Sequence, residues 1–342
     1  MGRIFVTGAT GFIGGALTTR LLERGDDIVA LARSDASAAK LGALGIRVVR
    51  GDVCDESSLV AGMAGCDLAY HCAGINSHCP DDPKLLLEVN ARGTERVVQA
   101  AGRAGVRRVV ITSSAASVGE PHGTVGDEHS VHRGTYLSVY DRSKHVGEQA
   151  AFAAAHRTGV ELVAICPSSV QGPGRKAGNG KLIIDYVNGK LPAFVDTYVS
   201  VVDIADCTEA HLLAAERGRP GARYILNGAT ITSGEALEMM AEISGVREHV
   251  RIVRPAVARS AATLLEAIYA VRGRTPSLCR ARIRTFLHGH RYDGSLATRE
   301  LGLVYTPVAE TFRRTIEWAV HEGLVTRPIP LSVDAMRQSV RG

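Results

Sequence analysis

The chain has no hydrophobic run long enough to cross a membrane. Spanning a bilayer takes about 20 consecutive apolar residues, and the nearest candidate, 256–271, is interrupted by Arg259 and Glu266. The opening Met-Gly-Arg leads directly into a predicted strand, without the apolar core of a signal peptide. We therefore expect no integral membrane segment, and a cytoplasmic protein.

Cysteine is scarce and shows no paired spacing. The 342 residues include seven cysteines and no CxxC motif, which argues against a disulfide framework and for a reducing compartment. His71, Cys72, His78 and Cys79 are close in sequence. However, the first two end a predicted buried strand and the last two follow in a loop, so no metal site is expected.

An excess of charge of one sign is also missing. The formal net charge of +5 is mild, so no nucleic-acid partner is expected. The segment 251–291 nevertheless holds nine Arg and a single acidic residue, Glu266. These Arg could coat solvated helices, or two or three could turn inward and hold an anionic group. The apolar stretch 256–271 could instead rest on a membrane surface or a second subunit, and a homodimer is expected.

Apolar strands and helices alternate through the first half of the chain. The strands are continuously apolar, which is typical of a parallel sheet buried on both faces. Strand–helix repetition favours right-handed crossovers and a Rossmann-type, doubly wound α/β fold. Strands are predicted at 3–7, 27–32, 47–50, 67–72, 108–112, 161–166 and 223–226. Helices are predicted at 11–24, 37–44, 56–63, 84–104, 140–156 and 203–216.

The pattern loosens after Pro167, and short helices dominate from Ser233 onward. The last of them, 308–321, carries the only Trp, Trp318, at an apolar helical spacing that predicts a core position. We expect a smaller, mainly helical C-terminal substrate domain. The predicted division is a nucleotide-binding domain at 1–228, with 171–200 contributing to the substrate cleft, a substrate domain at 229–330 and a tail at 331–342.

A glycine-rich turn, TGATGFIG, lies between the first predicted strand and the first helix. Its glycines allow a tight turn, close backbone approach to a pyrophosphate and close helix–strand packing. The helix then faces the phosphates with free N–H groups and the positive end of its dipole. This context predicts a dinucleotide site that contains Gly8, Thr10, Gly11, Phe12, Ile13 and Gly14.

The end of the second strand indicates which dinucleotide binds. An acidic residue there would repel a 2′-phosphate, but the chain has Arg33 and no acid before Asp35. Arg33 can pair with a 2′-phosphate and Lys40 can assist, which favours NADP(H). Alternatively Arg33 stacks on adenine and discriminates little, so NAD(H) stays open. Later strand ends add the expected cofactor contacts Asp52, Val53, Cys72, Ala73 and Gly74.

Tyr140 and Lys144 are one helical turn apart and therefore share a helix face. A phenol titrates near pH 10, so it needs a neighbouring cation, which favours the phenolate and lowers the phenol pKa. A hydroxyl should fix the substrate oxygen. Ser113 and Ser114 close the fifth strand at the sheet's carboxyl end, and alternation lets only one of them face the site. We assign Ser114 to this role.

The order TGATGFIG, GDV, HCAG, VNARGT, TSSAAS, YDRSK and CPSSVQGPG resembles the extended short-chain dehydrogenase/reductase superfamily over positions 3–230. The nearest branches are the dihydroflavonol-4-reductase-like and NAD-dependent epimerase/dehydratase-like proteins. The resemblance implies a catalytic triad of Ser114, Tyr140 and Lys144, and matches Arg33 and Lys40 to the reductase branch. It also implies cofactor-site positions at Asn90, Pro167, Ser168 and Val170.

Three functions follow from these residues. The first is an NADPH-dependent carbonyl reductase or alcohol dehydrogenase acting on a small organic ketone or alcohol. The second is an NDP-sugar epimerase or dehydratase with tightly bound NAD. The third is a non-catalytic dinucleotide sensor, which would not need Tyr140 and Lys144. The short loop after Gly174 and the presence of Arg33 favour the first function. Gly119 stands where plant flavonoid reductases carry a substrate-binding Asn, which argues against a flavonoid.

Overall fold

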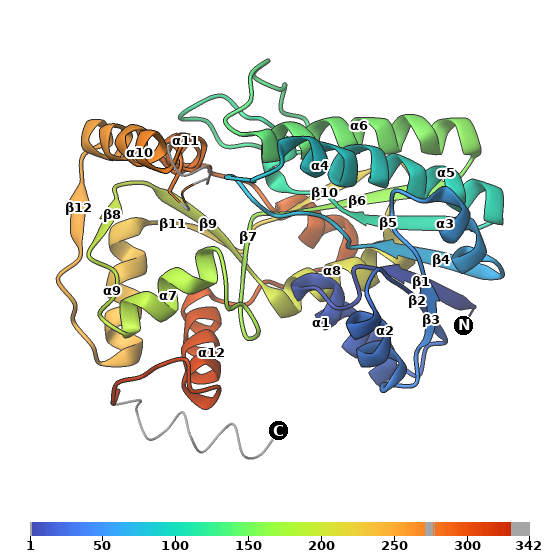
Figure 1. Cartoon of the computed structure of the whole chain (residues 1–342), viewed down its shortest axis with the longest axis horizontal. Helices are drawn as coiled ribbons and strands as arrows, with labels where there is room; N and C mark the ends of the chain where they lie inside the picture. The colour runs from blue at the N-terminus through green and yellow to red at the C-terminus, as the bar shows by residue number, and fades with distance from the viewer. Residues whose placement is uncertain (1, 271–275, 277, 330–342) are drawn as a thin grey trace.

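The computed structural model describes residues 2–270, 276 and 278–329. A seven-stranded parallel sheet and the helices that cover it form the larger part of the molecule (Figure 1). The strand order is β10-β6-β5-β4-β1-β2-β3. The chain winds outward in both directions from β1 and β4, which makes their junction the topological switch point where such sheets bind ligands. The strands are β1 (Arg3–Thr7), β2 (Ile28–Ala32), β3 (Arg47–Arg50), β4 (Cys66–His71), β5 (Arg108–Thr112), β6 (Glu161–Pro167) and β10 (Arg223–Leu226).

Helices cover both faces of this sheet and bury two separate cores. Alternate side chains of β1 show the division: Phe5 belongs to one core and Val6 to the other, and neither is exposed. The Val6 side is covered by α1 (Phe12–Glu23), α2 (Asp35–Gly42) and α8 (Ile204–Arg217). The Phe5 side is covered by α3 (Glu56–Met63), α5 (Thr94–Ala104) and α6 (Val139–Thr158). The predicted Rossmann-type doubly wound sheet is confirmed.

The prediction of one uninterrupted helix over 84–104 is wrong. It is divided into α4 (Pro83–Leu87), a π-helical turn at Glu88–Gly93, and α5. At this turn α6 packs so closely that a Cβ on Gly147 would lie 2.4 Å from the Asn90 carbonyl oxygen. The interruption depends on this contact with a helix some fifty residues later, so the local apolar period does not indicate it.

The remainder of the chain forms the second, smaller part (left in Figure 1). Helices predominate after Ser233, as predicted, and α12 coincides with its predicted range. The helices are α7 (Asn179–Val187), α9 (Ser233–Ser244), α10 (Pro255–Ala270), α11 (Arg280–His288) and α12 (Val308–His321). Short strands, which were not predicted, form two small sheets: β7 (Ser169–Gln171), β9 (Tyr198–Asp203) and β11 (Ala229–Thr232) in one, β8 (Ala193–Val195) and β12 (Arg251–Val253) in the other.

Trp318 is not a fully buried core residue as expected. It is half-buried on α12, and the Lys176 ammonium lies 5.7 Å from the centroid of its ring. The residues that α12 contributes to the core are instead Val308, Phe312 and Ile316. The domain boundary at 228 stays a prediction, and the predicted tail at 331–342 lies outside the described residues.

A disulfide joins Cys79, in the loop after β4, to Cys279, the residue before α11. The expectation of unpaired cysteines is therefore wrong for this pair, and the reducing compartment inferred from it loses its support. The two residues are 200 positions apart, so their pairing leaves no spacing signal in the sequence. The other five cysteines are free thiols.

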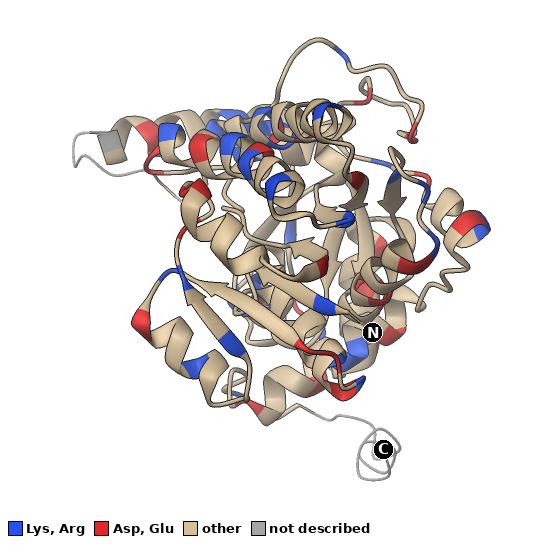
Figure 2. Cartoon of the chain, turned by 90° about the vertical axis from the view of Figure 1, so that its right-hand side faces the viewer, with Lys and Arg blue, Asp and Glu red and all other residues tan. Residues whose placement is uncertain are grey.

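None of the helices within the described ranges is long and apolar enough to cross a membrane. Figure 2 shows Lys and Arg interspersed with Asp and Glu over the outer helices. In the Arg-rich segment, Arg280 and Arg284 are exposed, whereas Arg282 is partly buried. Arg272 and Arg274 lie outside the described residues.

Candidate active site

A pocket of about 240 Å³ lies at the carboxyl ends of the central strands. Its floor comes from the ends of β4, β5 and β6 and from α6, and its far wall comes from α11 and the segment that follows it. The pocket brings together Ser114, Tyr140 and Lys144, as the sequence predicts. Of the expected cofactor residues it also contains Ile13, Cys72, Gly74, Pro167, Ser168 and Val170.

The first turn of α6 positions Tyr140. Ser138 is the N-cap residue, and its hydroxyl accepts a hydrogen bond from the Asp141 amide at 3.2 Å, which starts the helix two residues before Tyr140. Ser114 lines the pocket beside the phenol, whereas the neighbouring Ser113 donates to the buried carboxylate of Glu148. The two serines therefore point to different partners, as alternation along the strand predicts.

The pKa of Tyr140 is raised, because burial disfavours the phenolate more than the hydrogen bond from Ser114 favours it. We expected Lys144 together with the nicotinamide charge to lower this pKa, and for the complex with cofactor that expectation stays a prediction. The Lys144 ammonium donates to the Thr112 carbonyl oxygen at 3.1 Å. Burial lowers the pKa of Lys144 to about 8, so this lysine loses its charge within the neutral-to-alkaline range.

Asn90 lies behind the pocket wall. Its side-chain oxygen accepts from the Ile75 amide at 2.7 Å, and its nitrogen donates to the Ile75 carbonyl at 2.9 Å and to Ser143 at 3.0 Å. It is buried and is not among the residues that line the pocket. Asn90 thus fixes the loop after β4 against α6, and its place in the cofactor site stays a prediction.

The glycine-rich turn is tight and packs closely against the end of β4 and the start of α1. Gly8 has a φ of 73°, and a Cβ there would lie 2.6 Å from the Ala73 amide nitrogen. A Cβ on Gly14 would lie 2.2 Å from the Gly8 carbonyl oxygen. Helix α1 begins at Phe12 with no side-chain cap, so its first N–H groups are available to a phosphate. The turn therefore fits the pyrophosphate of NAD(P).

Arg33 and Lys40, expected to bind a 2′-phosphate, are both exposed. The Arg33 guanidinium lies 4.0 Å from a carboxylate oxygen of Asp52, so these two expected residues are neighbours at the sheet edge. The Asp52 carboxylate accepts from the Cys54 amide at 2.9 Å. Val53 is buried in the core.

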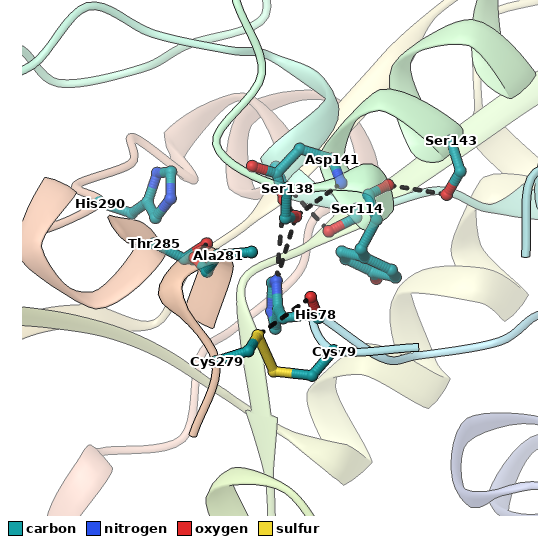
Figure 3. A network of polar contacts seen from close by, with 12 residues as sticks. His78, Cys79, Ser114, Ser138, Asp141, Ser143, Cys279, Ala281, Thr285 and His290 are labelled. Atoms are coloured by element: carbon teal, nitrogen blue, oxygen red, sulfur yellow. Dashed lines mark hydrogen bonds and ion pairs between the residues drawn. A yellow bond between two sulfur atoms is a disulfide. The ribbon is translucent and has the colours of Figure 1, made fainter. Parts of the chain in front are cut away.

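Several residues that line the pocket were not singled out individually from the sequence. The His78 ring packs edge-to-face on Tyr140 at 5.1 Å, and its Nδ1 lies 3.3 Å from the Ser138 hydroxyl (Figure 3). Arg175 is stacked over Phe12 at 5.3 Å, and donates to the Val170 carbonyl at 2.6 Å. The far wall consists of Arg282, Thr285, Phe286, His290 and Tyr292. None of these positions belongs to a recognisable motif.

The His71–Cys79 segment does not form the metal cluster that its composition suggests. Both ring nitrogens of His71 are engaged, with Thr7 at 2.7 Å and Thr94 at 3.0 Å, and Cys79 is in the disulfide. A different group, Glu120, His288 and His290, could offer three metal ligands within 4.8 Å of one another. The histidines hydrogen-bond to Glu120 and hold its pKa down at about 2 against the effect of burial.

The fold and the glycine cradle define a Rossmann-type dinucleotide-binding protein. Residues 4–226 match the model of the NAD dependent epimerase/dehydratase family. Sterol demethylase protein B of Methylococcus capsulatus is 33% identical over 326 residues, which cover 94% of this chain and 99% of that protein. A Stigmatella aurantiaca enzyme, 4-hydroxy-2-methyl-3-oxo-4-farnesyl-3,4-dihydroquinoline-1-oxide ketoreductase, is 32% identical over 311 residues, 88% of this chain and 91% of the enzyme.

Among solved structures, gox2253 superposes with a TM-score of 0.82 and 28% identity, covering 94% of this chain and 99% of the other. This chain belongs to the NAD-dependent epimerase/dehydratase family, within the extended short-chain dehydrogenases/reductases. The resemblance expected from the motifs is therefore confirmed.

Proposed function

We propose that this protein is an NADPH-dependent carbonyl reductase or alcohol dehydrogenase. The observation that carries the proposal is that Ser114, Tyr140 and Lys144 line one pocket, with the Tyr140 phenol beside Ser114. The bound nicotinamide would supply the hydride for reduction or accept it in oxidation. The Stigmatella relative is named a ketoreductase, which supports this reaction type.

The three side chains divide the remaining work. Tyr140, whose raised pKa keeps the phenol protonated at neutral pH, donates its proton to the substrate carbonyl oxygen as the alcohol forms. Ser114 donates a hydrogen bond to the same oxygen and holds it beside the phenol. Charged Lys144 binds the nicotinamide ribose and stabilises the phenolate that remains. Proton transfer of this kind contributes about 10²–10⁴-fold to the rate.

NADP(H) is the cofactor that the residues favour. Arg33 and Lys40 are exposed near the edge of the sheet where the adenosine ribose would lie. An arginine can contact a 2′-phosphate through two charge-assisted hydrogen bonds. Asp52, close to Arg33, is available to the adenine edge. NAD(H) remains the alternative if Arg33 only stacks on the adenine.

A second candidate function is that of an NDP-sugar epimerase or dehydratase. The observation in its favour is the charge of the pocket lining, which includes Lys144, Arg175 and Arg282 and, among the described residues, no Asp or Glu. Arg175 lies on Phe12 of the glycine-rich turn, however, so part of this charge serves the cofactor itself. A non-catalytic sensor is a weaker candidate, because it would not need the Tyr140–Ser114 contact.

Nucleotide analysis of the purified protein tests the proposal directly. We expect protein free of nucleotide, which binds NADPH more tightly than NADH and then oxidises NADPH when an aldehyde or ketone is added. Stoichiometric NAD that co-purifies and survives gel filtration would overturn the reductase in favour of the epimerase or dehydratase. Sedimentation of the same sample tests the expected homodimer.

A further inference from the structure

A second cavity, of about 620 Å³, lies on the other side of α11 from the catalytic pocket. It is open to solvent on one side and is lined by α7, β8, β12, α10 and α11. Most of its wall is apolar, formed by Ala177, Leu182, Ala193, Phe194, Val195, Val253, Val257, Ala258, Ala261, Leu278, Ile283 and Phe286. Its volume is within the range of about 300–1,000 Å³ that is usual for small-molecule sites.

The two cavities share a boundary. Arg282 and Phe286, one turn apart on α11, line both of them. The Arg282 guanidinium lies 5.7 Å from the centroid of the Phe286 ring, which in turn meets Phe194 edge-to-face at 5.8 Å. These two side chains therefore lie on the boundary between the cavities.

The backbone of α11 is fixed at both ends. The Cys79–Cys279 disulfide anchors its start to the loop that leads to His78. At its other end the Thr197 hydroxyl donates to the Phe286 carbonyl, and the His288 carbonyl lies 3.1 Å from His122 Nδ1. The helix is thus a fixed wall between Tyr140 and the apolar cavity, and Arg282 and Phe286 on it face both spaces.

The second cavity is poorly suited to a nucleotide. Its charged groups largely contact other side chains: Lys181 pairs with Asp185 at 2.5 Å, and Lys176 with Glu322 at 3.2 Å. A nucleoside diphosphate needs donors for two phosphates and polar partners for its base and ribose, because buried polar groups without partners are costly. The aliphatic and phenylalanine side chains of this wall offer neither.

We infer that the substrate is a carbonyl compound or alcohol with a large apolar body, of the size of a long alkyl chain or a fused-ring skeleton. Its reacting oxygen lies at Ser114 and Tyr140, and its apolar body passes Arg282 and Phe286 into the second cavity. The catalytic pocket, at about 240 Å³, is too small to hold such a body. The position of the reacting oxygen rests on the proposed function, but the occupancy of the second cavity does not.

Binding of an uncharged fluorescent probe tests the cavity without any turnover. We expect 1-aminoanthracene to bind saturably, and 1-alkanols to displace it with an affinity that rises about threefold to fourfold for each added methylene, as methylene burial predicts. The rise should stop when the cavity is full. Ala261 lines the cavity at an exposed position, so Ala261→Phe should fill it and weaken probe binding more than tenfold. The matched control is Ala267→Phe, exposed on the same helix and outside the lining, which should bind like the parent.

The inference is overturned if the probe does not bind saturably, if both variants bind like the parent, or if UDP-glucose displaces the probe and tetradecanol does not. NADPH titration of the same samples reports on the proposed function separately. Normal NADPH binding and reduction of hexanal, with no gain for longer aldehydes and no effect of Ala261→Phe, would reject the apolar substrate and leave the reductase intact. Saturable probe binding without reduction of any aldehyde would reject the reductase and leave the apolar binding cavity intact.

Discussion

The two sides of the catalytic pocket are built in different ways. The side expected to hold the cofactor comes from the carboxyl ends of adjacent parallel strands, which the fold itself brings together at one edge of the sheet. The substrate side comes from α11 and the residues after it, and contacts between residues far apart in the sequence hold it in place, such as the Cys79–Cys279 disulfide and the pairing of Glu120 with His290. Changes on the two sides should therefore have separable effects on cofactor and substrate.

The largest difference between the effect on turnover and the effect on NADPH affinity is expected for Tyr140, at the floor of the pocket. Tyr140→Phe keeps the ring and removes the proton donor, so turnover should fall by about 10²–10⁴-fold while NADPH affinity stays within a few-fold. Steady-state kinetics and a fluorescence titration measure the two quantities. Tyr136→Phe, outside the pocket lining, is the matched control and should keep parent turnover. A Tyr140→Phe enzyme as active as the control would rule out the phenol as the acid.

The disulfide should matter for the substrate side alone. Cys279→Ser removes a cross-link between distant segments, which typically costs about 2–4 kcal/mol of unfolding free energy. It also releases the start of α11, so KM for the carbonyl substrate should rise while NADPH affinity is retained. Urea unfolding and kinetics with and without a reductant measure both effects. An equal loss of NADPH affinity would show that the two sides are coupled, and Cys54→Ser, at a free thiol, should change neither.

Cofactor choice should respond only to the cofactor side. Arg33→Asp removes the expected contact with the 2′-phosphate, and loss of a charge-assisted hydrogen bond costs about 1.5–3 kcal/mol. NADPH affinity should fall roughly tenfold to a hundredfold, whereas NADH affinity should change little. Arg103→Asp, an exposed arginine on α5 that pairs with Glu56, controls for the change of net charge. An unaltered ratio of the two affinities would remove Arg33 from the cofactor site.

The pH dependence should reflect Lys144. Its pKa is lowered to about 8 by burial, so the ammonium is charged below that pH and is lost as the pH rises through it. Carbonyl reduction should therefore decline above about pH 8, because the cation that stabilises the Tyr140 phenolate disappears. Rate profiles of kcat/KM should show this descending limb in the parent. A Lys144→Arg enzyme with the same descending limb would assign the limb to another group.

The smallest expected effects are the differences in substrate KM among Gln variants of three neighbouring arginines of α11. Arg280 and Arg284 are exposed, and exposed charges contribute about 0–1 kcal/mol, so replacing either by Gln should leave KM within a few-fold. Arg282 lines both cavities, so Arg282→Gln should change KM for the substrate more than the other two. Kinetics at two salt concentrations make the comparison. Equal values for all three variants would place the substrate away from α11.

Much of the architecture could be predicted from the sequence, because its signals are local. The continuous apolar strands, the glycine-rich turn and the Tyr140–Lys144 spacing all fall within single elements, and the structure brings Ser114, Tyr140 and Lys144 into one pocket. What the sequence did not indicate occurs where distant segments meet. The π-helical turn at Glu88–Gly93 depends on contact with α6, and the raised pKa of Tyr140 depends on burial by several segments.

The sequence by itself determined the sheet, the glycine-rich turn and the spacing of Tyr140 and Lys144, since backbone conformation and helix periodicity act over a few residues. Only the tertiary structure decided what the substrate side contains. Cys79 finds Cys279 across 200 positions, and α10 and α11 line the apolar cavity with α7 and β8. Ordinary alanines, valines and phenylalanines form that cavity, and they acquire a binding function only when packing brings their helices and strands around one space.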